Sequence, residues 1–183
     1  MPSLSLLDKP LGQQHDLRTF ILETARLTLH EFTADDAPHI LGLLNTPGWL
    51  QYIGDRNIHT LAEAAQLIER TYQQKLRDHG FGFWAVYRKT DARFIGMCGF
   101  GGGQICPMLI LVCMRCCRLI AIRDTHEAAQ ATLDYAKTVL QIPKIIGVCD
   151  PQNIASRNLL QKLGMVLEKE IQWSDGSPTL LFS

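Results

Sequence analysis

The stretch Asp150-Pro-Gln-Asn-Ile-Ala-Ser-Arg-Asn-Leu-Leu-Gln-Lys-Leu-Gly-Met165 decides the fold of this 183-residue chain. It follows the run Lys144–Cys149, whose β-branched residues are typical of a buried strand. Asn153 is a favourable N-cap residue for a helix over Ile154–Leu163, and Gly164 supplies the left-handed stop that ends such a helix. A buried strand that leads through a tight turn into a helix indicates an α/β domain.

The remaining elements follow from hydrophobic periodicity and from capping signals. Thr60 and Glu63 form a capping box, and Lys89–Ala92 is a short polar turn between two apolar runs. In chain order, the sequence predicts a strand over Arg26–Phe32, a helix that starts after Thr33 and stops at Asn45–Gly48, a helix from Thr60 to about His79, strands over Phe81–Arg88 and Arg93–Phe100, a helix over Glu127–Leu140, and strands over Met165–Trp173 and Thr179–Phe182. We expect one domain over residues 23–183, preceded by an N-terminal arm over residues 1–22.

Charge and composition disfavour several classes of function. The 18 Lys and Arg residues balance 18 Asp and Glu residues, so the chain shows no electrostatic footprint for nucleic acid or an anionic membrane. A small polyanionic ligand is still compatible, because a helix N-terminus binds phosphate without net charge. The most apolar run, Pro107–Ile122, is too short for a membrane span and contains two arginines. The first residues lack the pattern of a signal peptide, so we expect a cytoplasmic protein with reduced thiols.

Three stretches together carry a resemblance to a known family. They are Glu23-Thr-Ala-Arg-Leu-Thr-Leu-His-Glu-Phe-Thr-Ala-Asp-Asp36, then Gly80-Phe-Gly-Phe-Trp-Ala-Val-Tyr87 with Phe94-Ile-Gly-Met-Cys-Gly-Phe100, and finally the deciding stretch, where Asn153, Ser156, Leu160, Lys162, Leu163 and Gly164 match the pattern N--S---LEKLGF. In this order they resemble the GNAT acetyltransferases, and within them the ribosomal-protein N-acetyltransferase (RimJ/RimL) type. The resemblance implies an α/β fold with a mixed, mostly antiparallel central sheet flanked by helices.

The resemblance also implies the reaction and its participants. An acetyl group passes directly from acetyl-CoA, the co-substrate, to a primary amine of a protein N-terminus or a small molecule, without a metal, in a monomer or homodimer. The residues implied as cofactor contacts are Asn153, Ser156, Asn158, Arg123, Thr125 and His126. Ser156 is the candidate proton donor to the departing thiolate, and Glu31, near the end of the first strand, is the candidate base.

Simpler roles remain open for several of these residues. Asn is common at an N-cap for reasons of helix stability alone, although a cap and a cofactor contact at Asn153 are compatible. Trp49 and Tyr52 follow the helix stop at Pro47-Gly48, so we expect them in a loop over the site, as substrate contacts or as core or lid residues. Trp84 is a candidate for a substrate contact or for the core.

The segment Gly101–Thr125 departs from the family pattern. The family has a central strand and then a pyrophosphate loop of the form (Q/R)-x-x-G-x-(G/A), whereas this segment has no glycine after Gly103 and holds four of the six cysteines. A local shift of the reading frame explains the departure. Permitted codons from Cys106 onward, taken two bases later, encode Pro-Asp-Ala-Asp-Ile-Gly-Leu-His-Ala-Leu-Leu-Pro-Ala-Tyr-Arg-Asp-Thr-Gly-Tyr-Ala, which resembles the missing strand and loop. The alternative is a catalytically impaired binding module without that loop.

The cysteines of this segment also suggest a zinc site, but the spacing argues against it. Structural zinc needs two ligand pairs, and only Cys113 and Cys116 form one. The frame shift or buried thiols account better for Cys106, Cys113, Cys116 and Cys117. The six histidines show no metal-ligand spacing either, so we expect no metal.

Overall fold

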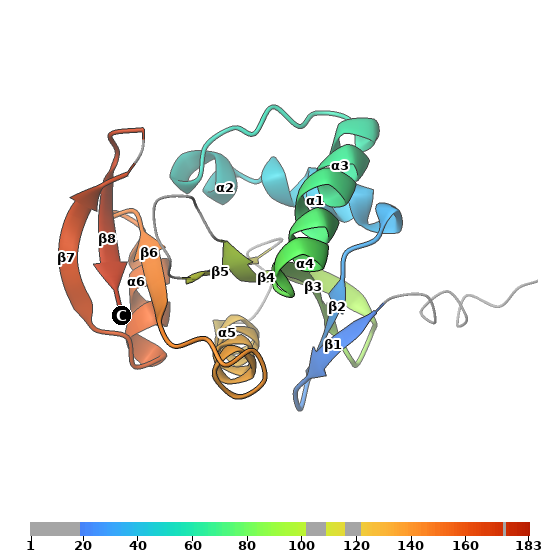
Figure 1. Ribbon diagram of the computed structural model, residues 1–183. Coiled ribbons are helices and arrows are strands. Elements are labelled where there is room, and N and C mark those ends of the chain that lie inside the picture. The colour runs from blue at the N-terminus through green and yellow to red at the C-terminus, as the bar shows by residue number, and fades with distance from the viewer. Residues whose placement is uncertain (1–18, 102–108, 116–121, 174) are drawn as a thin grey trace, which may run out of the picture.

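The computed structural model describes residues 19–101, 109–115, 122–173 and 175–183. Its centre is an eight-stranded sheet in the order β1-β2-β3-β4-β5-β6-β8-β7 (Figure 1). The strands are β1 (Phe20–Glu23), β2 (Leu27–Glu31), β3 (Phe83–Arg88), β4 (Arg93–Gly101), β5 (Leu109–Arg115), β6 (Ile145–Cys149), β7 (Leu167–Gln172) and β8 (Pro178–Phe182). Among these described strands, β5 and β6 pair in parallel and the other neighbours are antiparallel. The mixed, mostly antiparallel sheet expected from the sequence is therefore confirmed.

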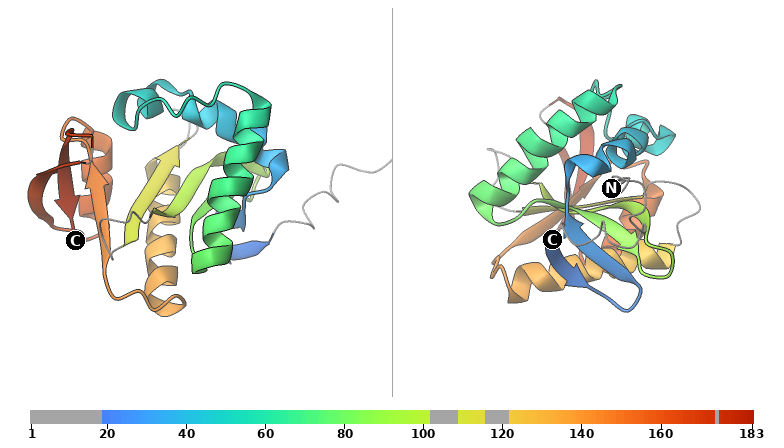
Figure 2. Two further views of the ribbon diagram at one scale, coloured as in Figure 1. Left: turned by 45° about the horizontal axis from the view of Figure 1, so that its top comes forward. Right: turned by 90° about the vertical axis from the view of Figure 1, so that its right-hand side faces the viewer.

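Helices cover both faces of this sheet (Figure 2). One layer contains α1 (Ala37–Leu44), α2 (Pro47–Tyr52) and α3 (Leu61–Leu67), and the opposite layer contains α5 (Ile122–Thr138) and α6 (Ile154–Lys162). Strand β3 separates the two, because successive side chains of a strand point to opposite faces. Trp84 and Val86 pack in the α5 layer, whereas Ala85 and Tyr87 pack in the α1–α3 layer.

The helix predicted over Thr60–His79 is confirmed in its extent and in both ends. It consists of α3, a π-helical stretch over Ile68–Gln73 and α4 (Gln74–His79). At its start, the backbone N–H of Glu63 donates to Oγ1 of Thr60 at 3.3 Å, and Oε2 of Glu63 accepts from the backbone N–H of Thr60 at 2.9 Å. At its end, Gly80 adopts a left-handed φ of 72°, a conformation that side chains with a Cβ disfavour.

Two differences from the predicted elements lie near the N-terminus. Strand β1 includes residues 20–22, which the sequence analysis assigned to the arm, because β1 pairs with β2 in the sheet. The second difference is α2, a helix in place of the expected loop around Trp49 and Tyr52. Its N-cap is Thr46, whose Oγ1 accepts from the backbone N–H of Trp49 at 3.3 Å, and Pro47 stands at the first helical position, where proline is favoured.

Two further differences fall within the segment Gly101–Thr125. Strand β5 occupies 109–115, where no element was predicted, and α5 begins at Ile122 rather than at Glu127. The cysteines considered for zinc at positions 106, 116 and 117 lie outside the described residues, and so does most of the arm. In the part of the chain that the structure describes, no group of three or more His, Cys, Asp or Glu residues is arranged to hold a metal ion.

Within the described ranges, no helix is both long and apolar enough to cross a membrane.

Candidate functional site

The parallel pair β5–β6 opens toward its carboxyl ends. The two strands pair at Leu109 with Ile145, at Ile110 with Ile146 and at Leu111 with Gly147. Beyond these positions β5 continues beside β4 and β6 continues beside β8, and no further described pairing joins β5 to β6. Figure 2 shows the two strands diverging toward their arrowheads. Such facing edges can bond an extended ligand through backbone N–H and C=O groups.

Two helix N-termini lie at this opening. Helix α5 follows β5 and α6 follows β6, and a helix that follows a parallel strand begins at that strand's carboxyl end. Each N-terminus carries free N–H groups and the positive end of the helix dipole, which together favour phosphate and other anions. The arrangement therefore offers a path for an extended ligand that carries negative charge.

The start of α6 is organised by Asn153, as the sequence predicted. Oδ1 of Asn153 accepts from the backbone N–H of Ser156 at 3.1 Å, which makes Asn153 the N-cap of the helix. Both residues are half-buried and lie within one helical turn, whereas Asn158 is exposed in the next turn. The structure thus brings Asn153 and Ser156 together at the opening, and the cap leaves the hydroxyl of Ser156 outside the Asn153 hydrogen bond.

A close approach between α6 and β6 fixes the position of this helix. A Cβ atom at Gly147 would lie 2.4 Å from Cδ2 of Leu160, which is closer than van der Waals contact allows. Leu160 is 5% exposed and belongs to the core layer under α5 and α6. Gly147 therefore lets α6 rest directly on β6, at the last residue that pairs with β5.

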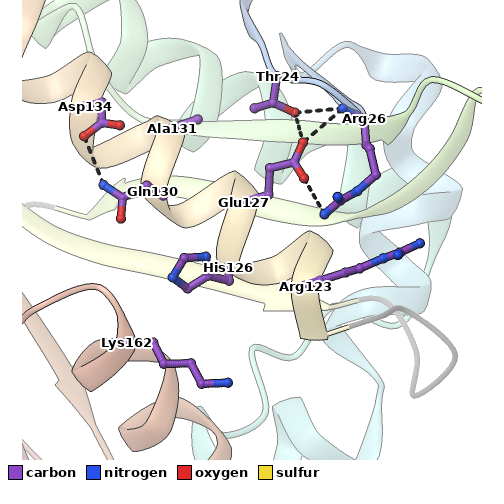
Figure 3. A pocket seen from close by; sticks show the side chains of 9 residues that line it. All are labelled: Thr24, Arg26, Arg123, His126, Glu127, Gln130, Ala131, Asp134 and Lys162. Carbon is purple, nitrogen blue, oxygen red and sulfur yellow. Dashed lines mark hydrogen bonds and ion pairs between the residues drawn. The ribbon is translucent and has the colours of Figure 1, made fainter.

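The start of α5 contacts the turn between β1 and β2, which is distant in the sequence (Figure 3). Nε of Arg26 donates to Oδ1 of Asp124 at 3.1 Å, and the Arg26 guanidinium also forms an ion pair with Oε2 of Glu127. Oε1 of Glu127 accepts from the backbone N–H of Arg26 at 3.0 Å and from the hydroxyl of Thr24. These contacts tie the first two turns of α5 to the N-terminal hairpin.

A pocket of about 890 Å³ lies along the outer face of α5, between this network and the end of α6. Its walls carry three cations, Arg26, Arg123 and Lys162, and two carboxylates, Glu127 and Asp134. The remaining lining residues are Thr24, His126, Gln130 and Ala131. A pocket of this size admits a small molecule, and its slight excess of positive charge suits a phosphorylated one.

Two of the cofactor residues expected from the sequence, Arg123 and His126, line this pocket, and Thr125 lies between them on α5. Figure 3 shows Lys162 projecting from α6 toward the same space. Sequence reasoning used Lys162 only as part of a motif and did not assign it to the site. Arg26 was missed as well, because only the fold brings the first hairpin beside α5.

The residues expected to contact the acceptor, unlike the expected cofactor residues on α5, do not line a common pocket in the described part of the chain. Trp84 is fully buried and packs edge-on against Phe100 and Tyr135, at ring-centroid distances of 6.1 and 5.5 Å. Trp49 is 6% exposed and belongs to the opposite core layer. In this structure both indoles therefore contribute to the core, which is the alternative that the sequence left open. Tyr52, at the end of α2, is half-buried.

Glu31 and Cys149 lie at different distances from the opening, since Cys149 is on β6 itself and Glu31 is on β2, which β3 and β4 separate from β5. Glu31 ends β2, is half-buried, and stands opposite Trp84 of β3 in the sheet register. Cys149 ends β6, and burial raises the pKa of its thiol to about 11. Cys149 is accordingly a neutral thiol at neutral pH, and a thiolate nucleophile is not available from it.

Comparison with known proteins gives one consistent result. Residues 26–166 match the family model described as an acetyltransferase (GNAT) domain. A Bacillus subtilis (strain 168) relative, the uncharacterized protein YkkB, is 29% identical over 159 residues, which cover 82% of this chain and 88% of YkkB. An acetyltransferase from Agrobacterium tumefaciens str. C58 superposes with a TM-score of 0.73 at 22% identity, covering 88% of this chain and 91% of that one.

A further solved structure contains a ligand. The ribosomal alpha-N-protein acetyltransferase RimL, solved in complex with coenzyme A, is similar to this chain with a TM-score of 0.74 at 15% identity, over 89% of this chain and 96% of RimL. At such identities the solved structures establish a common fold. The family model, which matches most of the chain, goes beyond the fold and identifies a protein family.

Proposed function

Because the chain belongs to the GNAT acetyltransferase family, we propose that it transfers the acetyl group of acetyl-CoA directly to a primary amine. The observation that carries this proposal is the opening between β5 and β6, with the N-termini of α5 and α6 at its mouth and a basic pocket beside them. An extended thioester with a phosphorylated end fits both parts of this site. The comparisons do not favour a binding module without catalysis, because the match is to an acetyltransferase family.

The residues proposed to hold the co-substrate divide between the two helices. Asn153 and Ser156 on α6 are proposed to contact the pantetheine arm beside the facing edges of β5 and β6, and Asn158, also proposed as a contact, lies further along α6. Arg123, His126 and Lys162 line the pocket and are proposed to bind the phosphates and the adenosine there, with Thr125 nearby on α5. The choice of coenzyme A as the ligand is supported by RimL, a protein of the same fold that was solved with coenzyme A.

The chemistry needs a neutral amine, donors for the developing oxyanion and a proton for the departing sulfur. We propose that the hydroxyl of Ser156 donates that proton, because it lies in the first turn of α6 at the opening. Backbone N–H groups on the unpaired edge of β5 are proposed as the oxyanion donors. Glu31 is proposed as the group that accepts the amine proton, directly or through water.

The acceptor is proposed to be an α-amino group of a protein N-terminus, as in the RimJ/RimL type that the sequence resembles, and Tyr52 is proposed as an acceptor contact. The ribosomal-protein acetyltransferase among the similar structures supports this class. We place the enzyme in the cytoplasm as a monomer or a homodimer. A small-molecule amine remains the alternative acceptor.

The proposal is tested by binding and then by turnover. Acetyl-CoA at about a hundred times its Kd should stabilise the folded protein by roughly 2.7 kcal/mol, which a thermal shift and calorimetry both measure. Release of free thiol should then be followed with peptides that begin with Ala or Ser, with spermidine and with an aminoglycoside. Binding of acetyl-CoA without any acetylated product in this panel would contradict the acceptor assignment, and absence of binding would contradict the whole proposal.

A further inference from the structure

The ion-pair network at the start of α5 forms one wall of the proposed cofactor pocket. Arg26 lines that pocket, and so does Glu127, while Asp124 stands behind them in the first turn of the helix. Arg26 bonds both carboxylates, as Figure 3 shows for Glu127. Arg123 is the second cation near Asp124, with Nε 3.7 Å from Oδ1.

Burial strengthens the electrostatic effect of the charged groups in this network. The side chain of Asp124 is 4% exposed and that of Glu127 is 18% exposed, whereas that of Arg26 is 39% exposed. Buried carboxylates are poorly screened by water and salt, so an unpaired one would act strongly on a charged neighbour. Both carboxylates stand in the first two turns of α5, where the helix dipole already favours negative charge. They therefore occupy the electrostatic position that a phosphate would need.

We propose that Arg26 is a positioning residue that makes the pocket receptive to phosphate, by holding and neutralising Glu127 and Asp124. With Arg26 in place, the guanidinium groups of Arg26 and Arg123 together offset the two carboxylates. Arg123, whose side chain is 73% exposed, also remains accessible to an anionic ligand, along with His126 and Lys162. Without Arg26, Arg123 alone faces two carboxylates, so a net negative charge remains at the wall of the pocket that Glu127 lines. The inference rests on the proposed binding of coenzyme A.

A purely structural role for Arg26 makes a different prediction. If Arg26 only anchors α5 to the N-terminal hairpin, its loss disturbs the whole site and weakens every ligand alike. If it balances charge, its loss weakens ligands in proportion to their negative charge. Removing one carboxylate would then compensate for the loss of Arg26, since the repulsive group is gone.

Two substitutions remove the charges of Arg26 and Glu127 while retaining the neighbouring hydrogen bonds. Arg26→Met keeps most of the side-chain length and the backbone N–H that donates to Glu127 at 3.0 Å. Glu127→Gln keeps an oxygen acceptor for that N–H and for the hydroxyl of Thr24 and removes the charge. The matched control is Arg88→Met, because Arg88 has a similarly exposed side chain, at 30%, and its ion pair with Asp91 lies outside the pocket.

The experiment measures the Kd of three probes that differ in charge: coenzyme A, 3′-dephospho-coenzyme A and uncharged pantetheine. Calorimetry or competition is used for the wild type, Arg26→Met, Arg88→Met and the double variant Arg26→Met/Glu127→Gln. We expect Arg26→Met to weaken coenzyme A about tenfold, dephospho-coenzyme A less, and pantetheine less than twofold. The double variant should recover most of the coenzyme A affinity, and 0.5 M salt should reduce the difference between variants.

The outcomes separate this inference from the proposal on which it rests. Wild-type protein that binds none of the three probes overturns the proposed function and the inference with it. Wild-type protein that binds coenzyme A, together with an Arg26→Met variant that loses all three probes equally, overturns the inference alone. A double variant as weak as Arg26→Met, or an equal loss in Arg88→Met, also overturns it.

Discussion

The two strand–helix units at the opening, β5–α5 and β6–α6, have the same topology but begin their helices in different ways. Helix α6 starts at a cap from the residue directly before it, since Oδ1 of Asn153 accepts from the N–H of Ser156 three residues later. Helix α5 starts in contacts with Thr24 and Arg26, which lie about a hundred residues earlier in the chain. The comparison shows that one half of the site is specified locally and the other half depends on the N-terminal hairpin.

This difference also divides the chemistry between the units. The locally capped helix carries Asn153 and Ser156 beside the opening, where the thioester is proposed to react. The distantly held helix carries Arg123 and His126 in the pocket, where the phosphates are proposed to bind. Substitutions on α6 should therefore affect turnover, the helix itself or the contact with the pantetheine arm, while substitutions around α5 should mainly affect affinity for the phosphates.

The largest expected effect tests the catalytic half. Ser156→Ala removes the proposed proton donor but keeps the backbone N–H that Asn153 caps. We expect kcat to fall about 10²-fold with little change in the KM for acetyl-CoA, because the interaction is made as the sulfur departs. Steady-state thiol release measures both constants.

The control for this prediction is Ser156→Thr, which retains a hydroxyl and should keep more activity than alanine. Denaturant unfolding of Ser156→Ala checks that α6 keeps its stability, so that a loss of activity can be assigned to the hydroxyl. An unchanged kcat would assign proton delivery to water or to another group, and Ser156 would then be only a first-turn residue.

The next effect concerns the packing of α6 against β6. Gly147→Ala places a Cβ 2.4 Å from Cδ2 of Leu160, so that side chain or the helix must move. We expect a loss of about 2 kcal/mol in the free energy of unfolding, in the range usual for overpacking. Denaturant unfolding measures this loss, and acetyl-CoA binding should weaken along with it.

Gly42→Ala is the matched control, since a Cβ at Gly42 meets nothing within 4 Å. Gly42 lies inside α1, where alanine should stabilise by up to about 1 kcal/mol. Equal effects of the two substitutions would mean that the contact with Leu160 does not fix α6.

The segment before α5 provides the third test. Replacing Cys106–His126 by the sequence from the shifted reading frame also exchanges the first residues of α5, with Arg123 and His126, and it supplies the glycine-containing loop that the family uses at the phosphates. We expect this replacement to tighten acetyl-CoA binding about tenfold, because backbone N–H groups of such a loop bind phosphate directly. Calorimetry on both proteins measures the change, and equal or weaker binding by the replacement would contradict the frame-shift explanation.

What the sequence predicts follows the same division between local and distant signals. The Thr60–Glu63 capping box, the stop at Gly80 and the Asn153 cap were each predicted, because every one of these signals lies within a few residues of the helix end that it sets. The paired strands β3 and β4 were also predicted, from two apolar runs around a short polar turn. Local patterns were sufficient for these elements.

The elements that sequence analysis missed depend on distant partners or on an ambiguous local signal. Strand β1 gains its structure by pairing with β2, and α5 gains its first turn from Arg26. Pro47-Gly48 was interpreted as a helix stop, but Thr46 before Pro47 forms a cap, so α2 begins there. In the site, the pair Asn153 and Ser156 was predicted on one turn, whereas the contribution of Arg26 to the pocket depends on the tertiary fold.

The smallest expected effect separates the two roles of Asn153. Asn153→Ala removes the acceptor for the N–H of Ser156 and should cost about 1 kcal/mol of stability through the cap alone. Asn153→Asp keeps an acceptor at the same place and adds a negative charge that suits the helix N-terminus, so the free energy of unfolding should stay within about 0.5 kcal/mol of the wild type. If Asn153 also contacts the co-substrate, Asn153→Asp should still weaken acetyl-CoA severalfold, because the amide donor is lost and a charge is added near an anionic ligand. Chemical denaturation and calorimetry on the two variants measure stability and affinity separately. An Asn153→Asp variant with wild-type affinity would leave Asn153 as a helix cap only, and the local half of the site would then contact the ligand through Ser156 and the backbone of β6.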